Sequence, residues 1–422
     1  MNLAQATSRF KSTSQKLFAF CLAASCLLFA FPAAASNQTV LYDFPGHPGG
    51  MKPYTGVVFD KSGNLFGVTS AGGPNFEGDV YELSPNGDGA WNYTEIYTFS
   101  CGAEGCYPSG LAFDDSGNLY VSTSVGGTGN TGTILEMTTD SARAWSETVL
   151  YSFGSDTSKD PQSGGGLVWF NGALYGVASG GTDQGGVVFS LTKTSAGDWV
   201  EATLHNFESG NDPSSIIVNT SGVILGTTSG SGPGGAGAGT VFELKQDETG
   251  TWKNRALHTF TAAEGIGPYS LVSDNAGNFY GTTAVGGPGE YGTVFELSKS
   301  SSTWTLSTLH AFSGGLDGAA PNGISLDSQG RVYGTTFQGG GRGLCENPPS
   351  SQNEFCGTAF LLTPTQAGTW RETFLHRFTG EKDGGEPAAG LIVDVNDNSY
   401  GTASEGGTTP YGLVFMLNAP GK

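Results

Sequence analysis

The stretch Ser270–Leu297 reads SLVSDNAGNFYGTTAVGGPGEYGTVFEL, and it decides the fold. It has an apolar start, an Asp-x-x-Gly-Asn turn, and an ending, Thr293–Leu297, in which apolar and polar residues alternate at the strand period. Asp can bond its own turn backbone and Gly supplies a positive φ, so the stretch predicts three short strands joined by tight turns. Copies begin near Gly56, Gly110, Gly166, Ser215, Gly323 and Gly390. A period of about 54 residues indicates a repeat architecture.

Six of the seven copies continue into a second half that predicts a fourth strand. Each of these holds one tryptophan: Trp91, Trp145, Trp199, Trp252, Trp304 and Trp370. Each closes on one phenylalanine: Phe99, Phe153, Phe207, Phe260, Phe312 and Phe378. Four-stranded units repeated around a ring make a propeller, so the sequence predicts an all-β, seven-bladed β-propeller.

The two ends of the repeat array complete each other. The seventh copy stops at Leu417 without the tryptophan-containing half, and Thr39–Phe44 matches the missing ending. A ring protects its strand edges when its last sheet is completed in this way. We therefore predict four-stranded blades closed by the N-terminal strand, in one domain over residues 37–422.

Residues 1–36 have the composition of a secretory signal peptide. Basic residues precede an apolar run over Leu17–Phe31, and Ala33-Ala34-Ala35 offers small residues for cleavage. The run is too short for a stable membrane span, and no later segment reaches about 18 apolar residues. The sequence predicts a secreted or periplasmic protein, with no C-terminal anchor after Leu417.

The charge balance argues against two classes of partner. The formal net charge is −20 at pH 7, and residues 1–36 contain basic residues but no acidic ones. The remainder is therefore more acidic still, which disfavours nucleic acid and anionic membranes as partners. We expect a soluble monomer, although the charge by itself names no ligand.

Four cysteines remain after residue 36, in two local pairs. An even number of cysteines in an exported chain indicates disulfides. The repeat places the pairs in different blades, which favours Cys101–Cys106 and Cys345–Cys356 among the three possible pairings. No C-x-x-C pair is present, so a zinc site formed by cysteines is not expected.

One loop departs from the repeat and is the best local indication of a binding site. The second-to-third-strand loop of the sixth copy is longer than its counterparts, and loops of this kind often carry function. We predict ligand contacts from Arg342, Glu346, Glu354 and Phe355. A tolerated surface insertion, held by Cys345–Cys356 against proteolysis, is the alternative.

The blade connections on the same face are acidic. Asp156, Asp212, Asp317 and Asp383 lie in them, and a carboxylate ring could hold Ca²⁺, which prefers oxygen ligands. The alternative is that these are solvated turn acids, in which case no cofactor is bound. Each connection ends near a proline: Pro53, Pro108, Pro161, Pro213, Pro268, Pro321 and Pro387.

Two further residue types invite a functional interpretation. His205, His258, His310 and His376 share one repeat position, which Tyr42, Tyr97 and Tyr151 fill in other copies. A position shared with tyrosine indicates packing with a polar tip on the outer strand. Trp169 lies in a first strand, which lines the channel of a propeller, so it either stacks on a ligand or packs in the core.

The repeat contains a characteristic string, Tyr280-Gly281-Thr282-Thr283 followed by Gly286-Gly287 and Gly292–Leu297. This string resembles the GloVer-type tandem repeat of exported bacterial proteins, the choice-of-anchor group. The resemblance covers nearly all of the chain after residue 36, with departures at Tyr120–Thr123 and Leu225–Thr228. It implies export and a propeller-like fold, and it brings no catalytic residues. Members often end in a surface anchor, which we do not expect after Leu417.

Three hypotheses about function follow from these features. The first is a secreted binding or scaffold propeller that recognises an extracellular carbohydrate or protein with its insertion-bearing face. The second is a propeller enzyme, a lyase or glycosidase acting on extracellular polysaccharide, which needs two carboxylates, or a histidine and a carboxylate, close together on that face. The third is a structural protein of the cell envelope. We favour the first, because no catalytic constellation is visible.

Overall fold

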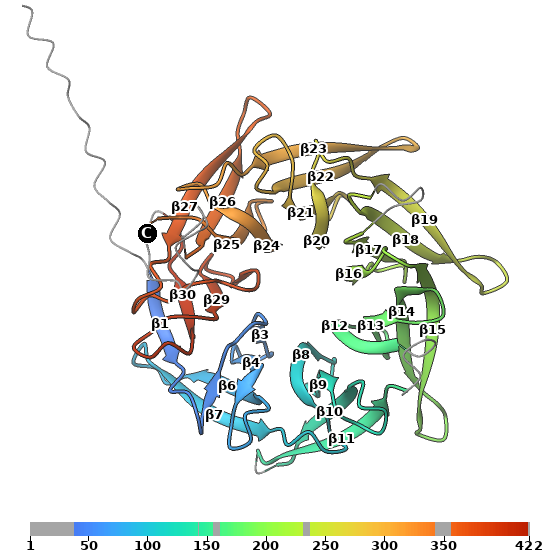
Figure 1. Cartoon of the computed structure of the whole chain (residues 1–422), viewed down its shortest axis with the longest axis vertical. Helices are drawn as coiled ribbons and strands as arrows, with labels where there is room; N and C mark the ends of the chain where they lie inside the picture. Colours follow the sequence, from blue (N-terminus) through green and yellow to red (C-terminus); the bar gives the residue numbers. More distant parts are fainter. Residues whose placement is uncertain (1–37, 142, 155–160, 231–236, 342–355, 421–422) are drawn as a thin grey trace, which may run out of the picture. The chain divides into compact units, whose positions relative to one another are not determined.

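The structure, a computed structural model, describes residues 38–141, 143–154, 161–230, 237–341 and 356–420, with the main chain alone for 161–165. Its strands form seven antiparallel four-stranded sheets arranged around a central channel (Figure 1). Consecutive strands of each blade are neighbours, running from the channel outward. The predicted all-β, seven-bladed propeller is confirmed.

The first and second strands of every blade are the two that lie nearest the channel. The first strands are β3 (Val58–Phe59), β8 (Cys106–Phe113), β12 (Pro161–Phe170), β16 (Pro213–Val218), β20 (Ile266–Ser273), β24 (Ala319–Leu326) and β28 (Ile392–Val393). The second strands are β4 (Leu65–Thr69), β9 (Leu119–Val125), β13 (Ala173–Gly180), β17 (Ile224–Thr228), β21 (Phe279–Val285), β25 (Val332–Gln338) and β29 (Ser399–Ala403).

The two outer strands complete each blade. The third strands are β6 (Asp79–Pro85), β10 (Thr133–Thr139), β14 (Gln184–Lys193), β18 (Thr240–Gln246), β22 (Thr293–Ser300), β26 (Thr358–Pro364) and β30 (Leu413–Leu417). The fourth strands are β7 (Trp91–Thr98), β11 (Trp145–Ser152), β15 (Trp199–Glu208), β19 (Trp252–Thr259), β23 (Thr303–Ala311), β27 (Trp370–Arg377) and β1 (Gln38–Asp43). A further pair, β2 (Gly50–Met51) and β5 (Ala71–Gly72), lies beside blade one. Within the described ranges no helix is long and apolar enough to cross a membrane.

The N-terminal strand closes the ring, as the sequence predicts. The seventh sheet has the order β1-β30-β29-β28, and β1 pairs with β30 from Gln38 opposite Leu417 to Asp43 opposite Leu413. In Figure 1 the blue β1 lies against the red strands of the last blade. Side chains strengthen the junction, because the backbone N–H of Thr408 donates to Asp43 Oδ2 at 2.8 Å.

The Asp-x-x-Gly-Asn turns form one repeated hydrogen-bonded unit. In blade five, Asp274 Oδ1 accepts from the backbone N–H groups of Ala276 and Asn278, each at 2.9 Å. The Asn278 side chain donates to Asp274 Oδ2 at 2.8 Å, so both carboxylate oxygens are used. The repeated spacing of the turn is therefore structural, since one aspartate accepts from two backbone N–H groups of the turn.

Adjacent blades are joined by aromatic contacts that recur around the ring. The closing phenylalanine of one blade packs against the third-strand aromatic residue of the next, as Phe260 packs on Phe295 with ring centroids 5.0 Å apart. The same contact links Phe153–Phe189, Phe207–Phe242, Phe312–Phe360, Phe378–Phe415 and Phe44–Tyr81. The last of these joins blade seven to blade one, so the closing interface uses the same packing as the others.

The second-strand glycine makes room for this aromatic ring. A Cβ placed on Gly281 would lie 2.4 Å from Cζ of Phe295, closer than any real contact. Blade two lacks the glycine and also lacks the ring, since Val121 pairs there with Leu135. The departure noted at Tyr120–Thr123 is thus a compensated exchange of volume between two strands.

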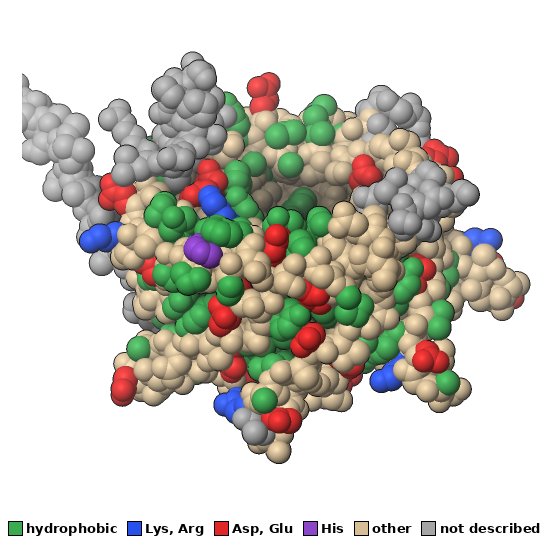
Figure 2. Space-filling model, turned by 60° about the horizontal axis from the view of Figure 1, so that its bottom comes forward, with side chains coloured by type: hydrophobic (Ala, Val, Ile, Leu, Met, Phe, Trp, Pro, Cys, Tyr) green, Lys and Arg blue, Asp and Glu red, His purple; other side chains and the backbone are tan. Residues whose placement is uncertain are grey.

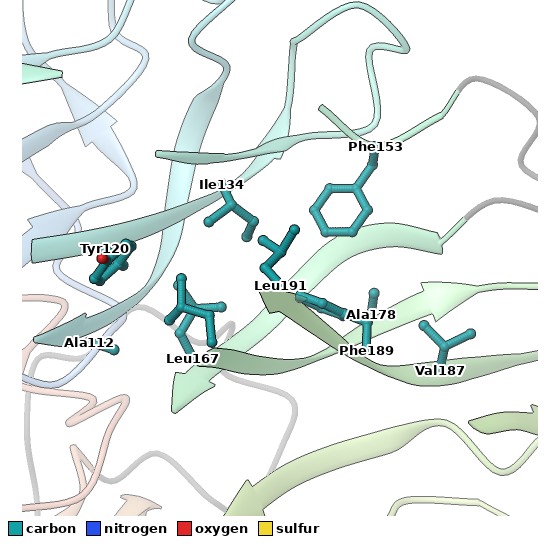
Figure 3. Close-up of a cluster of buried hydrophobic side chains, with 10 residues drawn as sticks. Ala112, Tyr120, Ile134, Phe153, Leu167, Ala178, Val187, Phe189 and Leu191 are labelled. Carbon is teal, nitrogen blue, oxygen red and sulfur yellow. The ribbon is translucent and has the colours of Figure 1, made fainter. Parts of the chain in front are cut away.

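Figure 3 shows one of the resulting interblade cores. Tyr120 and Ile134 from blade two meet Leu167, Phe189 and Leu191 from blade three, with Phe153 lying over the group. All are at least nine-tenths buried. Each blade therefore buries its apolar face against a neighbour, which is why a single blade could not be stable alone.

Replacing Gly281 by valine should destabilise the protein by about 3 kcal/mol, because the new side chain overlaps the Phe295 ring. The double variant Gly281→Val with Phe295→Leu recreates the Val121–Leu135 pair and should recover part of this loss. Urea unfolding of both single variants and the double variant measures the coupling. Strictly additive effects would contradict the proposed exchange of volume.

Replacing Phe44 by alanine should cost about 3 to 5 kcal/mol, because its side chain is fully buried in the closing interface. Val40→Ala is the control in the preceding strand β1, because Val40 is 39% exposed. Thermal unfolding compares the two variants. Equal effects would show that β1 does not seal the ring through its apolar face.

Candidate functional site

The central channel is the cavity to which all seven blades contribute. Its volume is about 340 Å³, and the first strands and the residues preceding them form its wall. The described lining is made of glycine, serine, threonine, small apolar residues and two tyrosines, Tyr54 and Tyr269. Among these lining residues none is an Asp, Glu, Lys, Arg or His. Figure 2 shows the hollow, whose visible wall is green and tan.

Two tyrosines stand out at one end of this channel. Tyr54 and Tyr269 directly follow the connection prolines Pro53 and Pro268, so they lie on the face that carries the blade connections. These two residues are 45% and 49% exposed. Thr55 lies beside Tyr54, and its buried Oγ1 has no hydrogen-bond partner. The mouth thus presents exposed aromatic surface, while the Thr55 hydroxyl lies buried beneath it.

The residues predicted from the insertion cannot be placed against this mouth. Arg342, Glu346, Glu354 and Phe355 lie outside the described residues, as does Cys345. Cys356 is described, and its sulfur is disulfide-bonded. The prediction for this loop therefore stays a prediction.

The other predicted disulfide is present. Cys101 and Cys106 are bonded, with their Cα atoms 4.7 Å apart, in the connection between blades one and two. Glu77 approaches both sulfurs, but the bond between them removes the thiolates that a metal would need.

Trp169 packs between blades rather than standing free. Its ring stacks on Tyr120 with centroids 5.2 Å apart and planes 11° apart, and its Nε1 donates to Asp115 at 3.4 Å. Both contacts cross from blade three to blade two. The geometry favours the core role for Trp169 over ligand stacking.

The four acids proposed for Ca²⁺ do not form one cluster in the described part of the chain. Asp156 lies outside the described residues, and Asp212 is exposed. The two others each bind inside their own blade connection: Asp317 accepts from the backbone N–H of Ser313 at 2.7 Å, and Asp383 from that of Thr379 at 3.1 Å. Asp317 and Asp383 are therefore each hydrogen-bonded within their own connection, and the calcium site stays a prediction.

Histidines of the outer strands are the partners of these acids. His310 Nε2 lies 3.2 Å from Asp317 Oδ1, and His376 Nε2 lies 3.0 Å from Asp383 Oδ2. The rings also contact the closing phenylalanines edge-on, as His310 does with Phe312 at 4.6 Å. The predicted packing role is seen, but the polar tip has a specific carboxylate partner.

One of these pairs has a third member. Glu372, on β27, brings its Oε2 to 3.8 Å from Nε2 of His310, across the junction of blades five and six. Burial raises the pKa of Glu372 to about 8, and the attraction of His310 only partly opposes it. Burial would also raise the pKa of Asp317, but the hydrogen bonds from His310 and Ser313 outweigh it and hold that pKa at about 2.

A second unusual carboxyl group lies in blade one. Asp79 occupies the place of the first threonine of the Thr-Val-Phe-Glu-Leu strand, and its side chain is fully buried. The corresponding threonines of other blades exchange hydroxyl hydrogen bonds, as Thr283 does with Thr293 at 2.9 Å. Asp79 reaches Thr69 at 3.4 Å through Oδ2, while its Oδ1 has no partner. Burial, followed by repulsion from Glu95, raises the pKa of Asp79 to about 7.

Sequence reasoning missed both Asp79 and Glu372. Asp79 could have been found, because Gly-Asp-Val-Tyr-Glu-Leu departs from Gly-Thr-Val-Phe-Glu-Leu at a single acidic position. Glu372 could not, since a glutamate on a fourth strand looks like any solvated strand residue until the neighbouring blade is placed against it.

Asp79 should make stability fall as the pH rises from about 4 to 7. Its pKa of about 7 in the fold exceeds the ~3.9 of an unfolded aspartate, so the folded chain holds the proton more tightly. Asp79→Thr removes this dependence. The difference in the free energy of unfolding between the variant and the wild type should therefore be about 2 to 3 kcal/mol more favourable to the variant at pH 8 than at pH 5. Urea unfolding at both pH values tests this. An identical difference at pH 5 and pH 8 would contradict it.

The ring of seven four-stranded sheets defines the chain as a β-propeller. The chain belongs to the Gloeobacter/Verrucomicrobia repeat family, which matches residues 23–185 and 163–347. This confirms the family resemblance drawn from the repeated strings. No curated protein matches the sequence.

Solved structures share the fold at low identity. A puromycin-hydrolyzing peptidase from Mycobacterium tuberculosis has a TM-score of 0.54 at 10% identity, over 91% of this chain and 56% of that one. The extracellular domain of a one-component system from B. thetaiotaomicron has 0.53 at 10%, over 90% and 42%. Hydrazine synthase from Kuenenia stuttgartiensis has 0.53 at 14%, over 86% and 94%. The chain spans about half the length of the first two. These likenesses show the fold alone.

Proposed function

We propose that this chain is an exported binding propeller that takes a neutral carbohydrate at the channel mouth. The observation that carries the proposal is the pair of half-exposed rings, Tyr54 and Tyr269, above a lining without charged side chains. A sugar presents C–H groups on the faces of its ring and hydroxyls on its edge. Aromatic faces suit the former, and hydroxyls and backbone groups suit the latter.

The polar groups needed for sugar hydroxyls are close by. Ser109 and Ser214 add hydroxyls to the wall, and the backbone of the lining glycines adds further hydrogen-bonding groups. The proposal places the binding face on the side of the predicted Cys345–Cys356 loop, with the chain secreted or periplasmic and monomeric.

The alternatives each need features of a different kind. A lyase or glycosidase in the channel needs two carboxylates, or a histidine and a carboxylate, and the described lining residues provide neither. An extracellular protein partner is the second possibility for the same face. A structural envelope role would need no free mouth at all. The carbohydrate proposal uses the exposed rings that the others leave unexplained.

A glycan array followed by calorimetric titration of the best neutral oligosaccharide tests the proposal. Tyr54→Ala and Tyr269→Ala should each weaken binding by about two- to tenfold, since one stacked ring contributes about 0.5 to 1.5 kcal/mol. Tyr107→Ala is the matched control, because Tyr107 is 40% exposed but does not line the channel.

The proposal would be overturned if the wild type bound no glycan on the array. It would also be overturned if the Tyr54/Tyr269 double variant bound the oligosaccharide with unchanged affinity. Retention of a protein ligand that depends on the same two rings would instead favour the protein partner.

A further inference from the structure

The outer edge of each junction between neighbouring blades carries the same two repeat positions, and we call this place the outer groove after the pocket lined by His205 and Asn254. The first is the His or Tyr position near the end of one fourth strand. The second lies four residues before the corresponding position in the next blade, and it is held by Gln38, Tyr93, Glu147, Glu201, Asn254, Leu306 and Glu372. The two positions meet in space: Tyr42 stacks on Tyr93 at 4.0 Å, and His205 Nε2 lies 3.0 Å from Asn254 Nδ2.

The groove between blades five and six differs from the others in its chemistry. His310 Nε2, a carboxylate oxygen of Asp317 and a carboxylate oxygen of Glu372 all lie within 4.8 Å of one another. Among the described residues this is the one such group of three potential metal ligands in which no member is tied up in a disulfide. The side chains come from three separate segments, since β23, the connection after it, and β27 supply one each.

One carboxylate oxygen of Glu372 accepts no hydrogen bond from the protein. Its side chain is only 12% exposed, and its Oε1 is fully buried without a hydrogen-bond partner. A buried carboxylate oxygen without a partner is unfavourable, and such groups are either neutral or bound to a cation. His310 and Asp317 remain 21% and 20% exposed, so an ion could reach the group from solvent.

We propose that this groove binds one zinc ion through His310 Nε2, Asp317 and Glu372. Zinc binds imidazole nitrogen and carboxylate oxygen at about 2.0 to 2.2 Å, and three ligands around one ion then lie roughly 3 to 4 Å apart. The distances of 3.2 Å and 3.8 Å from His310 fall in that range. A nitrogen ligand among oxygens favours zinc over Ca²⁺, which takes six to eight oxygens.

The neighbouring groove provides an internal comparison. Between blades six and seven, His376 and Asp383 repeat the pair of His310 and Asp317, but Gln38 stands where Glu372 would be. Gln38 donates through Nε2 to the backbone oxygen of Asp383 at 2.7 Å, so its amide is used by the protein itself. A histidine–aspartate pair is thus a sufficient seal for a groove. Sealing the groove therefore does not require the additional carboxyl group of Glu372.

Calorimetric titration of the full-length, EDTA-treated protein with ZnCl₂ tests the proposal. Wild type should show a site that Glu372→Gln weakens by at least about tenfold, because one of three ligands loses its charge. His376→Gln is the control in the adjacent groove and should leave that site unchanged. Thermal unfolding in EDTA should show that Glu372→Gln remains folded, since glutamine fills the equivalent position in the next groove.

Gln38→Glu is the complementary experiment, because it rebuilds the trio around His376 and Asp383 and should add a second zinc site. A wild-type protein that binds zinc no more tightly than Glu372→Gln would overturn the proposal. Tighter binding of CaCl₂ than of ZnCl₂ at the Glu372-dependent site would overturn the choice of metal.

Discussion

The contact between the closing phenylalanine of one blade and the third-strand aromatic residue of the next is the constraint on which this ring depends. Phe260 on Phe295 and Phe44 on Tyr81 have nearly the same geometry, although the second pair joins residues from the two ends of the propeller. The aromatic ring can reach its position only because the second strand of its own blade carries glycine, as at Gly281. The third-strand aromatic residue therefore packs both on the second-strand glycine of its own blade and on the closing phenylalanine of the preceding blade.

Functional chemistry enters where a blade departs from this shared pattern. Tyr54 and Tyr269 place exposed rings at positions that non-aromatic residues fill in the other blades, such as Ser109 and Ala388. Asp79 places a carboxyl group where blade five, for example, has Thr293, and Glu372 brings one beside the pair of His310 and Asp317. The described channel lining holds no charged side chain, whereas the trio of His310, Asp317 and Glu372 lies at the junction of blades five and six. That division separates the proposed carbohydrate contacts from the proposed metal ligands.

Much of the fold could be predicted because its determinants are local and repeated seven times. The turn aspartates, the alternation of Thr293–Leu297 and the matching half-unit at Thr39–Phe44 each act within a few residues or through simple counting. The candidate sites were less predictable. Asp317 was identified as an acid in a connection, but its binding to His310 depends on how the chain turns after β23. Trp169 was placed in a first strand correctly, yet its stacking on Tyr120 depends on the neighbouring blade.

The sequence by itself determined the number of blades, the four strands in each, the order of their pairing and the strand that closes the circle. Strand period, turn chemistry and repeat length carry that information directly along the chain. Only the tertiary structure decided which side chains face one another across a junction, because residues such as His310 and Glu372 are 62 positions apart and belong to different sheets. Their approach is set by the packing of whole blades, and no local pattern encodes it.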